Sequence, residues 1–168
     1  RQMRHSADYG IAKASFEFDF AQVMQRVAGI VRAIEPHDSV ERYMGLGVDV
    51  RIGTAKILDP WHVQVTQDDG SASVLSTRSI VVATGARPFM PPLPGLDEVG
   101  YRTSDTLWDL RELPRRLLVL GGGPIGCELA LAFARFGARV VQLEMAPRLM
   151  AREDPEVSEI VERRFREE

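Results

Sequence analysis

The spacing of hydrophobic residues changes along the chain, and each change marks a different kind of element. Between residues 20 and 34 apolar side chains recur every three or four positions, which predicts an amphipathic helix. Asp19 and Gln22 have the spacing of a capping box, so we expect the helix to begin there. A second, short helix is expected to end near Met44.

Between residues 48 and 83 the spacing becomes that of β-strands. Four stretches, VDVRI, TAKIL, HVQVT and ASVLST, alternate or nearly so, and Asp69-Gly70 predicts a hairpin turn between the last two. Residues 79–83 (SIVVA) are instead continuously apolar, which is typical of a strand buried on both faces. The prolines of residues 88–94 then predict a stiff connector that is neither helix nor central strand.

The last third of the chain has the pattern of a βαβ unit. Two apolar runs, at 117–120 and 139–144, flank a glycine-rich turn and a helix-compatible stretch. A final helix is expected after Asp154. We place the boundary between two structural units near residues 105–115, just before this βαβ pattern.

Composition narrows the class of protein. The 168 residues are 45% hydrophobic and 27% charged, with a formal net charge of −3, which is ordinary for a soluble globular protein and offers no basic surplus for nucleic acid. No apolar stretch is long enough to cross a bilayer, so no membrane partner is expected. The single cysteine, Cys127, excludes an internal disulfide framework and favours a reducing, cytoplasmic location. The three histidines lack the spacing of metal ligands, so no metal site is expected.

The turn of the βαβ pattern carries the main candidate chemistry. Gly121, Gly123 and Gly126 form a GxGxxG motif, which holds the pyrophosphate of a dinucleotide at a helix N-terminus. The first glycine would make the tight turn, the second would let the phosphates approach, and the third would let the helix pack closely on the strand. A glycine-rich turn without a ligand is the alternative. The flanking strand and helix, and an acidic residue at the next strand end, favour the nucleotide.

That acidic residue, Glu144, lies where the adenosine ribose is expected. A carboxylate there accepts hydrogen bonds from the ribose hydroxyls and repels a 2′-phosphate, which predicts NAD rather than NADP. Arg148 could instead accommodate the extra phosphate, and an ordinary solvated strand end is the alternative for Glu144. Cys127, in the first turn of the helix, is interpreted as a small packing residue rather than a redox group.

With residues 79–88 (SIVVATGARP) included, the ordered motifs resemble those of the pyridine nucleotide-disulfide oxidoreductases, which are flavoproteins with two dinucleotides. TSDTLWDL at 103–110, GGGPIGCE at 121–128 and the following EMAPRLM…REDPEV match in order and spacing, closest to the mercuric-reductase-like branch. The resemblance covers essentially the whole chain. It implies an α/β fold, with part of an FAD-binding domain and its β-rich segment at 1–110, and the first βαβ of a Rossmann-like NAD-binding domain at 111–168.

The resemblance also implies contacts with FAD and NAD. Gly53 and Ala55 match a strand whose backbone contacts the FAD adenine. Thr84 and Gly85 match a turn that lies against the FAD. The positions expected to hold NAD, the glutamate close to the nicotinamide end included, are Gly121, Gly123, Ile125, Gly126, Glu128 and Glu144.

Other parts of the family pattern are expected outside this chain: the redox CxxxxC pair, the FAD glycine fingerprint and the C-terminal dimerisation domain. We therefore assign no catalytic residue and interpret the chain as an internal piece of a homodimeric flavoenzyme. Such an enzyme passes a hydride from NAD(P)H, with NADH preferred, to flavin and on to a disulfide, a metal ion or another small acceptor. The alternatives are a flavin-free NAD-dependent dehydrogenase and a non-catalytic nucleotide-binding module.

Overall fold

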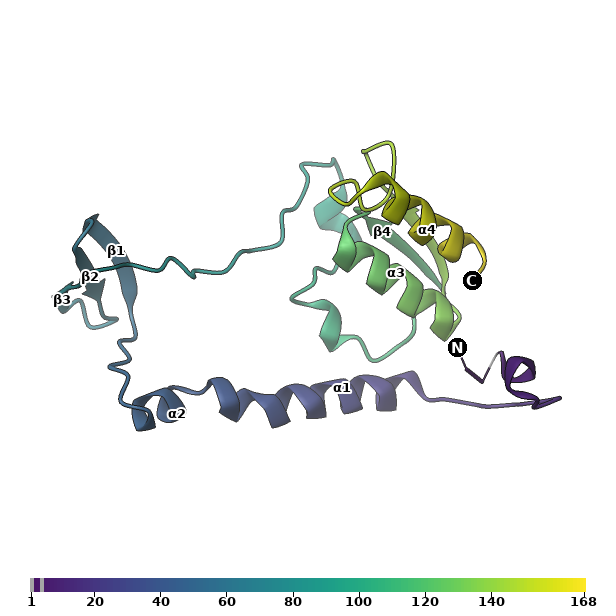
Figure 1. Ribbon diagram of the computed structural model, residues 1–168, viewed down its shortest axis with the longest axis horizontal. Helices are drawn as coiled ribbons and strands as arrows, with labels where there is room; N and C mark the ends of the chain where they lie inside the picture. Colours follow the sequence, from purple (N-terminus) through teal and green to yellow (C-terminus); the bar gives the residue numbers. More distant parts are fainter. Residues whose placement is uncertain (1, 4) are drawn as a thin grey trace. The chain divides into compact units, whose positions relative to one another are not determined.

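The computed structural model describes residues 2–3 and 5–168, which form two compact units (Figure 1). One unit combines the chain up to Ala28 with Leu93–Glu168, and the other is Gly29–Pro92. The helices are α1 (Phe20–Ile34), α2 (Val40–Gly45), α3 (Pro124–Phe136) and α4 (Pro155–Arg166), and the strands are β1 (Thr54–Asp59), β2 (His62–Thr66), β3 (Ala72–Ser76), β4 (Arg116–Leu120) and β5 (Arg139–Leu143).

The unit Gly29–Pro92 contains an antiparallel sheet in the order β1-β2-β3. The predicted hairpin between β2 and β3 is confirmed. Gln67 N–H donates to the Ser71 carbonyl over 2.9 Å, and the Asp69 carboxylate accepts from Ser71 N–H over 2.8 Å. Gly70 has a φ of +83°, a conformation that glycine adopts without steric cost. The Asp69 carboxylate and the glycine at position 70 thus account for the predicted turn.

Two predicted strands are wrong. Residues 48–52 and 79–83 form no strand, and Val81 and Val82 are 88% and 67% exposed. A strand buried on both faces needs hydrogen-bonded neighbours and a covering layer on each side. Within the described part of the chain no strand pairs with residues 79–83. The apolar run therefore shows that residues 79–83 have side chains suited to burial. It does not show that they form a strand in this structure.

The predicted βαβ unit is confirmed. Strands β4 and β5 are parallel, with Leu118 opposite Val141, and α3 packs on one face of this small sheet (Figure 1). Gly137 ends α3 at a φ of +106°, as expected for a left-handed helix stop. The other face of the sheet is open, because the apolar side chains there are between 43% and 57% exposed: Leu118, Leu120, Val141 and Leu143.

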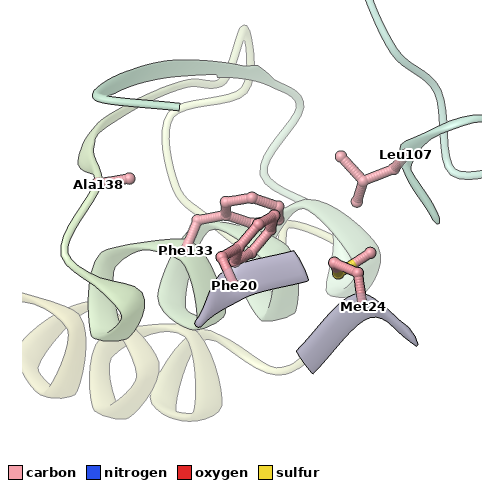
Figure 2. Packing of buried hydrophobic residues seen from close by; sticks show 5 residues of the cluster. All are labelled: Phe20, Met24, Leu107, Phe133 and Ala138. Atoms are coloured by element: carbon pink, nitrogen blue, oxygen red, sulfur yellow. The ribbon is translucent and has the colours of Figure 1, made fainter. Parts of the chain in front are cut away.

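The hydrophobic core of this unit joins the start of α1 to α3. Figure 2 shows Phe20 and Met24 of α1 beside Phe133 of α3, with Leu107 and Ala138 in the same cluster. The ring centroids of Phe20 and Phe133 are 5.9 Å apart, within the range of favourable aromatic contact. Residues 93–110 therefore pack in the same unit as the βαβ motif, and the division between residues 110 and 111 remains a prediction.

Helix α1 has the predicted bounds and cap. The Asp19 carboxylate accepts from Ala21 N–H over 2.8 Å and from Gln22 N–H over 3.2 Å, which satisfies two of the free amides at the helix start. Helix α2 likewise follows Ser39, whose hydroxyl accepts from Arg42 N–H over 3.2 Å. The apolar stripe of α1 is buried only in its first half, and three of its later members are between 44% and 60% exposed: Ile30, Val31 and Ile34.

Replacing Phe133 with alanine tests the core. Phe133 is only 4% exposed, so the cavity left behind is expected to lower the free energy of unfolding by about 3–5 kcal/mol. Leu118→Ala, in the same unit but 57% exposed, is the matched control and should cost less than half of that. Urea denaturation measures both, and equal losses in the two variants would contradict this core.

Candidate functional site

The glycine-rich turn between β4 and α3 is bound to β5 through both the N–H and the carbonyl of one residue, Gly121. Gly121 N–H donates to the Leu143 carbonyl over 2.8 Å, which extends the parallel ladder beyond β4. The Gly121 carbonyl accepts from the side-chain amide of Gln142 over 2.9 Å. Gly121 has a φ of +113°, which favours glycine, and it makes the predicted tight turn out of the strand. The sequence did not predict the hydrogen bond from the Gln142 side chain to this turn.

Gly122 connects the turn to the segment that follows β5. Its N–H donates to Oε2 of Glu144 over 2.5 Å, and its carbonyl accepts from Met150 N–H over 2.7 Å and from the Cys127 thiol over 3.3 Å. A Cβ at this position would lie 2.7 Å from Cδ2 of Leu149. Sequence reasoning missed Gly122, and the available signal was the run of three consecutive glycines.

The other two glycines of the motif have opposite surroundings. A Cβ on Gly126 would collide with the carbonyl oxygen of Gly121, so the helix can lie this close to the strand end only with glycine there. A Cβ on Gly123 would meet no other part of the described chain within 4 Å. The space at Gly126 is thus filled by the chain itself, whereas the space beside Gly123 is open.

Helix α3 begins without a side-chain cap. Its N-cap residue is Gly123, and its first residue, Pro124, has no N–H to offer. Cys127 N–H already donates to the Gly123 carbonyl over 3.0 Å. The amides of Ile125 and Gly126 therefore lie at an uncapped helix start, where the helix dipole favours an anion.

Glu144 lies directly after β5 with its carboxylate against the glycine turn. Oε1 accepts from Ala146 N–H over 2.7 Å, while Oε2 holds Gly122 N–H. The bonds from Ala146 and Gly122 hold the pKa of the Glu144 carboxyl below its ordinary value, so the group is ionised at neutral pH. A carboxylate has about four acceptor positions, so this exposed side chain can also accept from a ligand. Sequence reasoning placed Glu144 correctly at the strand end but missed its bond to Gly122.

Arg148 is engaged with its own loop. Its Nη1 atom donates to the Glu153 carbonyl over 2.9 Å and to Oγ of Ser158 over 2.5 Å. Its Nη2 atom donates to the Ala151 carbonyl over 3.0 Å. Three of the five guanidinium N–H groups thus hold the loop between β5 and α4. Sequence reasoning missed Ser158, for which a serine inside a helix was the only signal.

Cys127 packs beneath the glycine turn. Its side chain is buried, and its thiol donates to the Gly122 carbonyl over 3.3 Å. Burial raises the pKa of the Cys127 thiol despite a contact from the Gln142 amide, so the thiol stays protonated. The interpretation of Cys127 as a packing residue is confirmed.

Two of the residues expected at FAD lie at the edge of the three-stranded sheet. A Cβ on Gly53 would collide with the carbonyl oxygen of Thr66, so Gly53 allows the chain to approach β2 closely. Ala55 is in β1 and pairs with Val65 of β2. Close backbone packing alone therefore accounts for the glycine at position 53.

The remaining predicted positions lie in exposed parts of the chain. Thr84 and Gly85 follow the extended residues 79–83, and Gly85 has a φ of +69°. Ile125 is 61% exposed and Glu128 is exposed, both near the start of α3. The structure thus brings the glycine turn and Glu144 together. Thr84 and Gly85 belong to the other unit, Gly29–Pro92.

Two further classes of site were sought over the described ranges. No group of three or more His, Cys, Asp or Glu side chains there could hold a metal ion. Across the same residues, no helix is both long and apolar enough to span a membrane.

Comparison with known proteins identifies the family. The family model described as pyridine nucleotide-disulphide oxidoreductase matches residues 8–168. The mercuric reductase of Streptomyces lividans is 40% identical over 142 residues, which are 84% of this chain and 29% of that protein. The dihydrolipoyl dehydrogenase of Chlorobaculum parvum is 34% identical over 165 residues, 96% of this chain and 34% of that protein.

A solved structure supports the same conclusion. The HOCl-induced flavoprotein disulfide reductase RclA from Escherichia coli has a TM-score of 0.69 and 29% identity, with 99% of this chain and 36% of that chain covered. This chain spans about a third of the length of the relatives that it matches. The chain belongs to the pyridine nucleotide-disulphide oxidoreductase family.

Proposed function

We propose that this chain is part of a longer FAD-dependent oxidoreductase whose glycine turn binds NADH. The observation that carries the proposal is the open space beside Gly123 at an uncapped helix start, with an ionised Glu144 bound to the same turn. The family membership and the share of its relatives that the chain spans support a longer protein with two dinucleotides.

The pyrophosphate would lie at the start of α3. The amides of Ile125 and Gly126 supply donors there, the helix dipole adds positive potential, and Gly123 leaves room for phosphate oxygens. Gly126 acts indirectly, because it allows the helix to approach the strand end. These features suit the binding of a phosphate group at this point of the chain.

The adenosine ribose would lie at Glu144. Its bonds to Gly122 and Ala146 fix the carboxylate in one orientation, so it is preorganised to accept from both ribose hydroxyls. The same charge repels a 2′-phosphate, and Arg148 is held elsewhere by its loop. We therefore propose that NADH is preferred to NADPH.

The flavin site would use the backbone of Gly53, Ala55, Thr84 and Gly85, with residues 1–110 as part of the FAD-binding domain. Residues 111–168 would begin the NAD(P)-binding domain, with Glu128 towards the nicotinamide end. Bound FAD supplies the capacity to take up a hydride, while the chain supplies binding and orientation. The names of the relatives, mercuric reductase and dihydrolipoyl dehydrogenase, favour a metal ion or a disulfide as the acceptor. We further propose that the longer protein is a cytoplasmic homodimer.

Replacing Gly123 with valine tests the pyrophosphate site. The Cβ of the new side chain would meet no other part of the described chain, and its methyl groups would occupy space that a phosphate needs. Reduction of the bound flavin by NADH, followed by anaerobic stopped-flow absorbance, is expected to be lost while flavin content and unfolding stay unchanged.

Gly126→Ala is the matched control, because its Cβ would collide with the Gly121 carbonyl oxygen. It should lower the stability of the protein, whereas Gly123→Val should not. An unchanged affinity for NADH in Gly123→Val would show that the turn is an ordinary one without a nucleotide.

Replacing Glu144 with alanine tests the choice of nucleotide. Loss of a charge-assisted hydrogen bond should weaken NADH use and relax discrimination against NADPH by a factor on the order of ten in kcat/KM. Glu144→Gln keeps one oxygen acceptor, for Gly122 N–H, but removes the charge and replaces the oxygen that accepts from Ala146 N–H by an NH2 group, so its effect on NADH should be smaller than that of Glu144→Ala. A wild-type protein that prefers NADPH would overturn the assignment and favour Arg148 as the phosphate ligand.

The lowered pKa of Glu144 predicts how acid affects the glycine turn. Because the folded pKa lies below the ordinary value of 4.5, the stabilisation from the carboxylate is complete above that pH and is lost as pH falls through the folded value. The difference in free energy of unfolding between wild type and Glu144→Gln, measured by urea denaturation, should be constant above pH 4.5 and shrink below it. A difference that grows as pH falls would contradict the bonding found here.

A further inference from the structure

We propose that the hydrogen bond between Ser158 and Arg148, here called the latch, keeps the Arg148 guanidinium away from the ribose site and thereby sets the selectivity for NADH. The proposal rests on the proposed function of the glycine turn. It adds a positioning residue, Ser158, that lies in α4, outside the glycine motif, and is hydrogen-bonded to Arg148 and Met150.

The Ser158 side chain is both polar and buried. It lies near the start of α4 and is only 1% exposed. A buried hydroxyl destabilises a protein unless it is hydrogen-bonded, and this one is bonded twice. It donates to the Met150 carbonyl over 3.1 Å and accepts from Nη1 of Arg148 over 2.5 Å. Ser158 thus fixes both the loop backbone and the guanidinium.

The loop that Ser158 holds has an unfavourable backbone conformation. Met150 has a φ of +52°, a left-handed conformation that a residue with a side chain rarely adopts and that persists only where the surroundings impose it. In this conformation Met150 N–H reaches the Gly122 carbonyl over 2.7 Å. The latch therefore also supports the contact between the loop and the glycine turn.

Arg148 is adjacent along the chain to the residues that make this contact. It is four residues beyond Glu144 and directly precedes Leu149, whose side chain lies against Gly122. Removing the Ser158 hydroxyl removes one of the two acceptors of Nη1 and also the bond to the Met150 carbonyl, which should loosen the loop that carries the guanidinium. A guanidinium pairs with a phosphate through two parallel hydrogen bonds, so a released Arg148 is suited to a 2′-phosphate.

The test compares variants of the flavin-loaded protein that contains this chain, with NADH and NADPH as reductants. Ser158→Ala should lower kcat/KM for NADH and raise it for NADPH, mainly through KM, so that the ratio changes on the order of tenfold. Adding Arg148→Ala to Ser158→Ala should remove the gain with NADPH but not restore NADH. Glu159→Ala, at an exposed neighbouring position on α4, is the matched control and should leave the ratio unchanged.

If Ser158→Ala does not retain flavin, Arg148→Lys provides the second variant. Lysine keeps the cation but cannot make the three bonds of the guanidinium, so the same shift towards NADPH is expected. A wild-type preference for NADH that persists in these variants would overturn the latch and leave the proposed function intact. A gain with NADPH that survives removal of Arg148 would also overturn it. A wild-type flavin that neither nucleotide reduces would overturn the proposed function itself.

Discussion

The candidate site depends on the backbone of Gly122, whose N–H and carbonyl are both hydrogen-bonded within the chain. Its N–H holds the Glu144 carboxylate, and its carbonyl accepts from Met150 and Cys127. One residue thus joins the glycine turn, the end of β5 and the loop beyond it. With these groups satisfied by the chain itself, the amides at the start of α3 are left for an anion. The bonds that stabilise the turn therefore also orient the Glu144 carboxylate, which would bind the ribose hydroxyls.

Two exposed apolar features fit the proposal that the chain is part of a longer protein. Leu118 and Val141 lie opposite each other on the open face of the β4–β5 sheet, and residues 79–83 are extended without a strand partner. Both are the surfaces that a larger sheet and its covering layers would bury. The chain spans about a third of the length of its relatives, which are therefore long enough to supply such layers.

Local signals predicted the elements that depend on local chemistry. The Asp19 cap, the Asp69-Gly70 hairpin and the βαβ unit are present as expected. The failures at 48–52 and 79–83 involve strands whose formation depends on neighbours that periodicity cannot supply. The roles of Gly122, Gln142 and Ser158 were missed for a related reason. Each depends on hydrogen bonds between residues that are 8 to 28 positions apart, and no spacing rule encodes those bonds.

The most direct test of the account is a crystal structure of the flavin-loaded protein in complex with NAD⁺. We expect pyrophosphate oxygens at the amides of Ile125 and Gly126, adenosine ribose hydroxyls on the Glu144 carboxylate, and Arg148 still bonded to Ser158. A nucleotide bound with its pyrophosphate away from the start of α3, or with its ribose away from Glu144, would contradict the central claim.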